Sequence, residues 1–159
     1  MSTPFFSTPE RLSALWDAAK SWENTPWAAG SGIKGRDGGA CCHRLAIGVL
    51  ADAGFPITQA EAPNGTLNRA THFEGSVMAD WLREHPDRFQ EITPAVWSTL
   101  QAGDVFTIRL GLGAHHVAVM ADAETVVHSW QGVGAHMERI VDPKLRKRVA
   151  HIFRPIETS

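Results

Sequence analysis

The sequence predicts an α+β domain, with N-terminal helices packed on an antiparallel sheet of about five strands. In the first third of the chain, apolar residues recur with the helical period. From Gly103 onward the period changes towards two, which is typical of short strands. A length of 159 residues and an apolar fraction of 43% are enough for a substantial core. We therefore expect residues 1–159 to form a single domain.

The first helix is expected from Thr8 to Trp22. Thr8 is a suitable N-cap, and Pro9 follows at the first helical position, where its missing N–H costs no hydrogen bond. Leu12 and Leu15 begin an apolar stripe that continues over the next turn.

A second helix is expected from about Cys42 to Ala53, directly after a glycine-rich loop. Cys42 shares the apolar face that Leu45 and Ala46 continue, so its thiol should lie between this helix and the sheet. A thiol at a helix N-terminus also meets the positive end of the helix dipole and unpaired backbone N–H groups. Both favour the thiolate, which is the nucleophilic form of cysteine.

Residues 56–94 are less regular, although Glu74–His85 has the pattern of a helix that Pro86 ends. Beyond Gly103, alternating apolar residues and Gly or Asp turns indicate five strands. These strands are expected at Val105–Leu110, His116–Met120, Thr125–Trp130, His136–Val141 and Val149–Phe153.

Two histidines lie on neighbouring strands of this predicted sheet. If residues 121–123 close a hairpin, Met120 pairs with Glu124 across the turn. The same register places His116 directly opposite His128, with Cβ atoms about 4.5–5.5 Å apart on one face.

A cysteine, a histidine and a polar orienting residue, in this order, are typical of a cysteine hydrolase. Cys42 would attack a carbonyl carbon, His116 would form a thiolate–imidazolium pair with it, and His128 would fix the tautomer of His116. The Cys42 backbone N–H is a candidate donor to the oxyanion.

His115 competes with His116 for the role of base. Adjacent residues of a strand point to opposite faces, so only one of the two can meet Cys42. Apolar residues follow both positions with a period of two, so the period alone does not show which of the two histidines faces Cys42. The hairpin register favours His116. Histidines outside the candidate site, His136 among them, are expected at the solvent or at an interface.

At these residues the sequence resembles the NlpC/P60 cysteine peptidases, papain-like enzymes that cut peptidoglycan stem peptides. The resemblance covers Trp22 to about Ile140 and depends on the order and spacing of several short segments. These segments are Asn24-Thr25-Pro26-Trp27 followed by Gly30, Cys41-Cys42-His43-Arg44-Leu45, Ala102-Gly103-Asp104-Val105-Phe106, His116-Val117-Ala118-Val119-Met120 and Val127-His128-Ser129.

The resemblance implies a papain-like NlpC/P60 fold and cleavage of an amide bond in cell-wall stem peptides through Cys42, His116 and His128. A peptide or peptidoglycan fragment would be the partner, and no cofactor is expected. The side chains expected to line the substrate cleft are Trp27, Cys41, His43, His115 and Trp130.

The substrate side of the chain departs from the family pattern. Cys41 stands where the family has Asp, His43 and Arg44 replace Ser-Gly, and Trp27 replaces Tyr. The interval between nucleophile and base is longer than in compact family members, so we expect an insertion at 56–94. The nucleophile is kept, whereas the surface that selects the substrate is changed.

Two other functions fit the same residues. The triad would also serve an amidase or acyltransferase with another substrate, and the fold would also suit a catalytically silent binding or virion-assembly module. No signal peptide is visible, which predicts synthesis in the cytoplasm and fits a phage-type, virion-associated or released member best.

Composition argues against several other classes. A formal charge of −2 gives no electrostatic basis for binding nucleic acid, and no segment approaches the ~20 apolar residues of a membrane span. The 8 histidines and 2 cysteines include no Cys-x₂-Cys or His-x₃-His spacing, so no metal site is expected. Metal-dependent hydrolysis is the remaining alternative, and a chelator would reveal it.

Overall fold

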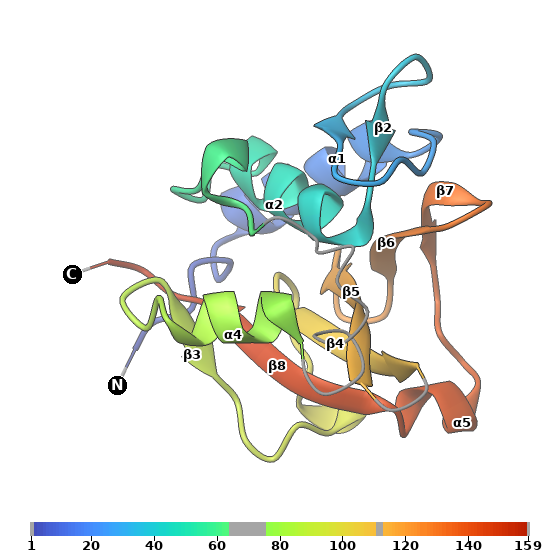
Figure 1. The fold of residues 1–159 in the computed structure, drawn as a ribbon. Coiled ribbons are helices and arrows are strands. Elements are labelled where there is room, and N and C mark those ends of the chain that lie inside the picture. The colour runs from blue at the N-terminus through green and yellow to red at the C-terminus, as the bar shows by residue number, and fades with distance from the viewer. Residues whose placement is uncertain (1, 64–75, 111–112, 159) are drawn as a thin grey trace.

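The computed structural model has an α+β fold in which helices cover one face of a six-stranded antiparallel sheet (Figure 1). It describes residues 2–63, 76–110 and 113–158, with only the backbone of residues 113–115. The strand order is β3-β8-β4-β5-β6-β7. The strands of this sheet are β3 (Phe89–Glu91), β4 (Val105–Leu110), β5 (Gly113–Met120), β6 (Val126–Trp130), β7 (Gly134–Glu138) and β8 (Val149–Pro155). The predicted fold class is confirmed.

The first two helices lie where the sequence predicts them. Helix α1 spans Pro9–Trp22, and the Thr8 side chain accepts a hydrogen bond from the Arg11 backbone N–H at 3.2 Å. Helix α2 spans Cys42–Asp52 and follows a two-stranded ribbon of β1 (Gly32–Ile33) and β2 (Gly39–Ala40). The N-cap of α1 and the glycine-rich loop before α2 were therefore reliable signals.

The segment predicted to be an insertion contributes more regular structure than its sequence indicated. Helix α4 spans Val77–Arg83, and the Ser76 side chain caps it by accepting a hydrogen bond from the Ala79 N–H at 3.1 Å. This cap starts the helix later than the predicted Glu74, which lies outside the described residues. The segment also provides β3, at the edge of the main sheet. Further short helices in the described part of the chain are η1 (Gln59–Glu61), η2 (Trp97–Thr99) and α5 (Pro143–Arg146).

The sheet separates two apolar layers. Val117, Val119 and Val127 belong to the layer that includes the buried faces of α1, α2 and α4. Ala118 and Met120 belong to the opposite layer, which the segment around η2 and α5 helps to cover. Alternation along the strands therefore divides the core as expected for a sheet buried on both faces. No helix among the described residues is both long and apolar enough to cross a bilayer.

The predicted register of the hairpin between β5 and β6 is wrong by two residues. Met120 pairs with Val126 and not with Glu124. The cause is the Asp122 side chain, which accepts hydrogen bonds from the backbone N–H groups of Glu124 and Thr125 at 2.8 and 2.7 Å. This Asx turn moves the loop one residue along the chain. A shift of two residues keeps every side chain on its face, so the two histidines still meet, but diagonally.

Packing between α1 and α2 depends on the absence of a side chain at Gly48. A Cβ built there lies 2.2 Å from Cζ2 of Trp22, whose indole N–H donates to the Asp52 carboxylate at 2.9 Å. Helix α2 can therefore lie directly against the Trp22 ring. The position of Cys42 at the start of α2 depends on this contact.

We predict that Gly48→Ala destabilises the protein, by about 1–3 kcal/mol, because the Trp22 ring must move. Alanine alone would stabilise a helix by about 1 kcal/mol relative to glycine, so the sign of the change is diagnostic. Urea unfolding measures it, with Ser13→Ala on the exposed face of α1 as the control without a clash. A Gly48→Ala protein more stable than wild type would contradict the packing described here.

Candidate active site

The start of α2 is held in place by two neighbouring segments, the loop at Ser31 and strand β6. Cys41 is the N-cap residue, and its backbone N–H donates to the Ser31 carbonyl at 3.1 Å. The Ser129 hydroxyl on β6 donates to the Ala40 carbonyl at 2.8 Å. In Figure 1 the beginning of α2 accordingly lies beside β6 and β5. These bonds fix Cys42, the first residue of the helix, next to the two strands that carry the histidines.

The Cys42 thiol lies against β5 and is half-buried. Burial raises the pKa of Cys42 to about 12, because a thiolate is poorly solvated there. The backbone N–H of Val117 donates to the sulfur and opposes this rise, as do the N–H groups at the start of α2. The helix N-terminus thus acts in the predicted direction, but burial outweighs it. This balance favours the thiol over the expected thiolate in the free protein.

His116 and His128 form a buried pair. Their side chains are 4% and 0% exposed, and His116 Nε2 lies 2.8 Å from His128 Nδ1. The structure pairs β5 with β6 through Val119–Val127 and Met120–Val126. Beyond these pairs the two imidazole rings bridge the strands. The Cys42 sulfur reaches β5 at the Val117 N–H, one residue along the backbone from His116.

Trp130 sets the positions of the protons in this pair. Its indole stacks on the His116 ring, with centroids 3.7 Å apart and planes within 7°. The indole N–H donates to His128 Nε2 at 3.2 Å. Because an indole nitrogen is only a donor, His128 Nε2 is the acceptor, and a neutral His128 carries its proton on Nδ1. That proton is donated to His116 Nε2, which leaves the proton of a neutral His116 on Nδ1.

Burial keeps both histidines neutral. It lowers the pKa of His116 to about 3, with smaller contributions from the nearby His43 and His136. It also lowers the pKa of His128 to about 3, and the Glu138 carboxylate only partly opposes this effect. The lowered pKa values favour the neutral form of both imidazoles, and the raised pKa of Cys42 favours its neutral thiol.

His136 and Glu138 lie next to the His116–His128 pair. The sequence did not indicate either of them as a residue of the site. His136 pairs directly with His128 across β6 and β7, and the two ring centroids lie 4.6 Å apart. Glu138 is on the same face of β7, with its carboxylate 3.6 Å from His128 Nε2. His136 is partly exposed, as expected, but its contact with the His128 ring was not predicted. The turn signal at Gly132, which gives Trp130–Gly134 pairing, would have placed it opposite His128.

The residues predicted to line the cleft have different surroundings. Trp27 is half-buried, in a segment whose neighbour Pro26 accepts a hydrogen bond from the Ala40 N–H. His43 is buried and close enough to His116 to affect its pKa. Cys41 is also buried, and its burial leaves little surface for a substrate. The side chain of His115 lies outside the described residues. The roles of these residues in substrate binding stay predictions.

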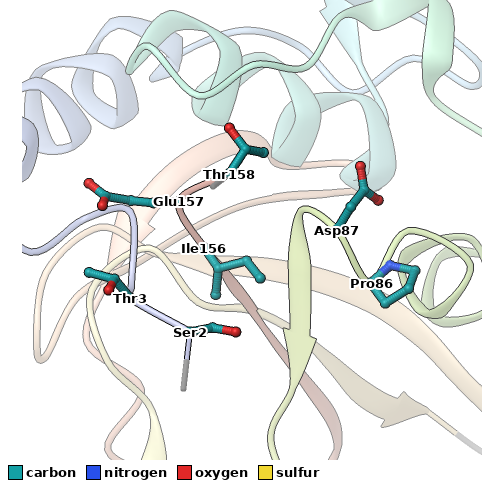
Figure 2. A pocket seen from close by; sticks show the side chains of 7 residues that line it. All are labelled: Ser2, Thr3, Pro86, Asp87, Ile156, Glu157 and Thr158. Atoms are coloured by element: carbon teal, nitrogen blue, oxygen red, sulfur yellow. The ribbon is translucent and has the colours of Figure 1, made fainter.

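A separate hollow lies at the two ends of the chain (Figure 2). Of the described residues, its lining includes no candidate catalytic side chain. It is formed by Ser2, Thr3, Pro86, Asp87, Ile156, Glu157 and Thr158. The candidate catalytic residues among the described part of the chain therefore gather at the start of α2 and not in this hollow.

A cysteine at a helix start, beside a buried histidine pair on antiparallel strands, defines a candidate cysteine hydrolase site. The fold is that of NlpC/P60 domains. Neither a protein-family model nor a curated protein sequence matches the chain.

Three solved structures show the likeness in fold. An NLP/P60 family protein from Staphylococcus aureus, described as similar to lipoprotein, matches with a TM-score of 0.60 and 17% identity over 99% of this chain. An NlpC/P60 family protein from Bacillus cereus matches with a TM-score of 0.56 and 18% identity over 92% of this chain. The NlpC/p60 domain of the peptidoglycan hydrolase SagA matches with a TM-score of 0.52 and 14% identity over 89% of this chain. The chain spans 45% and 40% of the first two proteins and 96% of the SagA domain.

We predict that iodoacetamide alkylates Cys42 of the free protein at a rate that keeps rising with pH to at least pH 10. The rate follows the thiolate fraction, and burial places the pKa of Cys42 at about 12. Mass spectrometry of tryptic peptides measures the adduct, and Cys42→Ser isolates the contribution of Cys41. A plateau reached below pH 8 would show a preformed thiolate–imidazolium pair and contradict the neutral resting state.

Proposed function

We propose that the protein is a cysteine hydrolase that cleaves an amide bond in peptidoglycan stem peptides through Cys42, His116 and His128. The observation that carries this proposal is the buried His116–His128 hydrogen bond beside a thiol at a helix start. Burying two imidazoles costs free energy, and a core of this size does not need them for stability. Their use is explained if His116 exchanges a proton with Cys42.

The reaction begins when the Cys42 thiol gives its proton to His116 and the sulfur attacks the carbonyl carbon. Since His116 Nε2 is bound to His128, Nδ1 is the ring nitrogen that takes this proton. The backbone N–H groups at the start of α2 stabilise the oxyanion. The amine leaves with the proton from His116, and a thioester on Cys42 remains. Water attacks the thioester, again with His116 as base, and the free thiol is restored.

This sequence requires a change of tautomer from the resting state. His116 must present an unprotonated Nδ1 to the thiol, so its own proton moves to Nε2 and His128 must accept at Nδ1. The proton of His128 is then on Nε2, facing the Glu138 carboxylate 3.6 Å away. In the active arrangement the Glu138 carboxylate therefore accepts a hydrogen bond from the Nε2–H of His128.

The peptidoglycan substrate is supported by the fold alone. One of the matching structures is a domain of a protein described as a peptidoglycan hydrolase. The buried His43 beside His116, and Trp27 on the segment docked against β2, are the side chains through which this chain would select its own substrate.

We predict that purified peptidoglycan or defined stem-peptide fragments release new amino termini with the wild-type protein. Cys42→Ser or His116→Ala should lower kcat by at least about 10³-fold, because the nucleophile or its base is removed. Liquid chromatography with mass spectrometry identifies the bond that is cut. His85→Gln is the matched control, since His85 bonds to the Trp81 carbonyl in α4. Cys42→Ser with wild-type activity would contradict the proposal.

A second candidate is a catalytically silent binding module with the same fold. The raised pKa of Cys42, to about 12, favours it, because a thiol that resists ionisation is a poor nucleophile without its base. Sedimentation with purified peptidoglycan separates the two. Binding without cleavage, unchanged in Cys42→Ser, would establish the silent module.

A further inference from the structure

We infer that His128, His136 and Glu138 form a binding site for a transition-metal ion such as Zn²⁺, and that the bound ion switches the hydrolase site off. The binding claim stands on the geometry of the three side chains. The inhibitory claim rests in addition on the proposed function, because the site shares His128 with the candidate triad.

The three residues meet because of strand register. His128 on β6 pairs directly with His136 on β7, and Val126 pairs with Glu138 two positions further along. Side chains at alternate positions share a face, so His136 and Glu138 both project beside the His128 ring. The candidate ligand atoms, one from each residue, all lie within 4.8 Å of one another.

These atoms suit a tetrahedral ion after small adjustments. Bonds of about 2.0–2.1 Å from Zn²⁺ to imidazole nitrogen and carboxylate oxygen require ligand atoms about 3.4 Å apart. His128 Nε2 and Glu138 Oε1 are 3.6 Å apart. His136 Nε2 and Glu138 Oε2 are 2.5 Å apart and must separate, which the half-buried His136 and Glu138 side chains can do. Two imidazoles and one carboxylate are an established ligand set for zinc with one open position.

The position of the His128 proton in the resting state already suits metal binding, because Nε2 is unprotonated. His128 Nε2 accepts a hydrogen bond from Trp130, so its lone pair points out of the ring towards this side of the site. The other nitrogen, Nδ1, carries the proton and donates to His116 Nε2 at 2.8 Å. A metal-bound histidine commonly donates its second N–H to such a partner. The ion would take the place of the Trp130 hydrogen bond.

The ion has a route to the site. The His136 and Glu138 side chains are 27% and 40% exposed, whereas His128 is fully buried behind them. Solvent can therefore deliver the ion and supply water as a fourth ligand. The negative charge of Glu138 offsets part of the charge of the ion.

Metal binding and the active tautomer exclude each other. The proposed reaction needs the His128 proton on Nε2, facing Glu138. A metal on Nε2 prevents this and holds the proton on Nδ1, where it is donated to His116 Nε2. His116 then cannot hold its own proton at Nε2, and its Nδ1 is not free to accept the proton of Cys42. The bound ion would thus stabilise the resting arrangement.

Binding is tested first, with Zn²⁺ alone, by isothermal titration of the full chain. Cys41→Ser/Cys42→Ser serves as the background, so that thiolates cannot bind the metal. We expect one ion per chain, and an affinity at least about tenfold weaker in His136→Ala and in Glu138→Gln, with His85→Gln unchanged. Co²⁺ bound to the wild-type chain should give visible bands without a sulfur-to-metal charge-transfer band. Equal affinity in all variants, or a charge-transfer band, would overturn the site.

Inhibition is tested on the wild-type protein with its thiols intact. Zn²⁺ should inhibit hydrolysis over the concentration range in which it binds, and a chelator should restore the rate. In His136→Ala, inhibition relative to that variant's own rate should require at least about tenfold more Zn²⁺. Equal sensitivity would assign inhibition to Cys42 and overturn the switch, and loss of activity with the chelator would indicate a metal-dependent hydrolase. A wild-type protein without activity would refute the proposed function, while the titration would still decide the metal site.

Discussion

The candidate site depends on one hydrogen bond, between His116 Nε2 and His128 Nδ1. This bond joins β5 and β6 where their backbones no longer pair, and it leaves the second nitrogen of His116 as the one that the proposed reaction uses. Trp130 contacts both partners of this bond. Its ring stacks on His116, and its indole N–H donates to His128. Burial holds both rings neutral, because an imidazolium loses more solvation than the nearby Glu138 returns. In the proposed reaction the candidate base and the candidate orienting residue are therefore coupled through the positions of two protons.

Features that depend on a few neighbouring residues, such as the starts of the helices, could be predicted from the sequence. Thr8 and Pro9 began α1 as expected, and the glycine-rich loop placed Cys42 at the first residue of α2. The predicted register placed His116 and His128 on one face, and they still share that face although the observed register differs by two residues. The choice of His116 over His115 as the base stays a prediction. The register error itself came from the Asp122 side chain, which closes the turn by its own hydrogen bonds.

What the sequence could not predict was set by packing between distant segments. The pKa of Cys42 depends on how much of the core surrounds it, and burial there exceeds the effect of the helix N-terminus. His136 and Glu138 join the site through the pairing of β6 with β7, which depends on a turn that the strand pattern did not resolve. The comparison with solved structures supports the fold at 14–18% identity, so the chemistry has to be argued from the side chains of this chain.

Nitrogen-15 NMR of the imidazole rings tests most directly whether the His116–His128 pair is neutral and ordered by Trp130. Long-range spectra distinguish a protonated from an unprotonated ring nitrogen, and His116→Gln and His128→Gln assign the signals. At neutral pH without metal, the account predicts that both His116 and His128 carry one proton, on Nδ1, and that Trp130→Phe removes this preference from His128. A proton on His128 Nε2, or a doubly protonated His116, would contradict it.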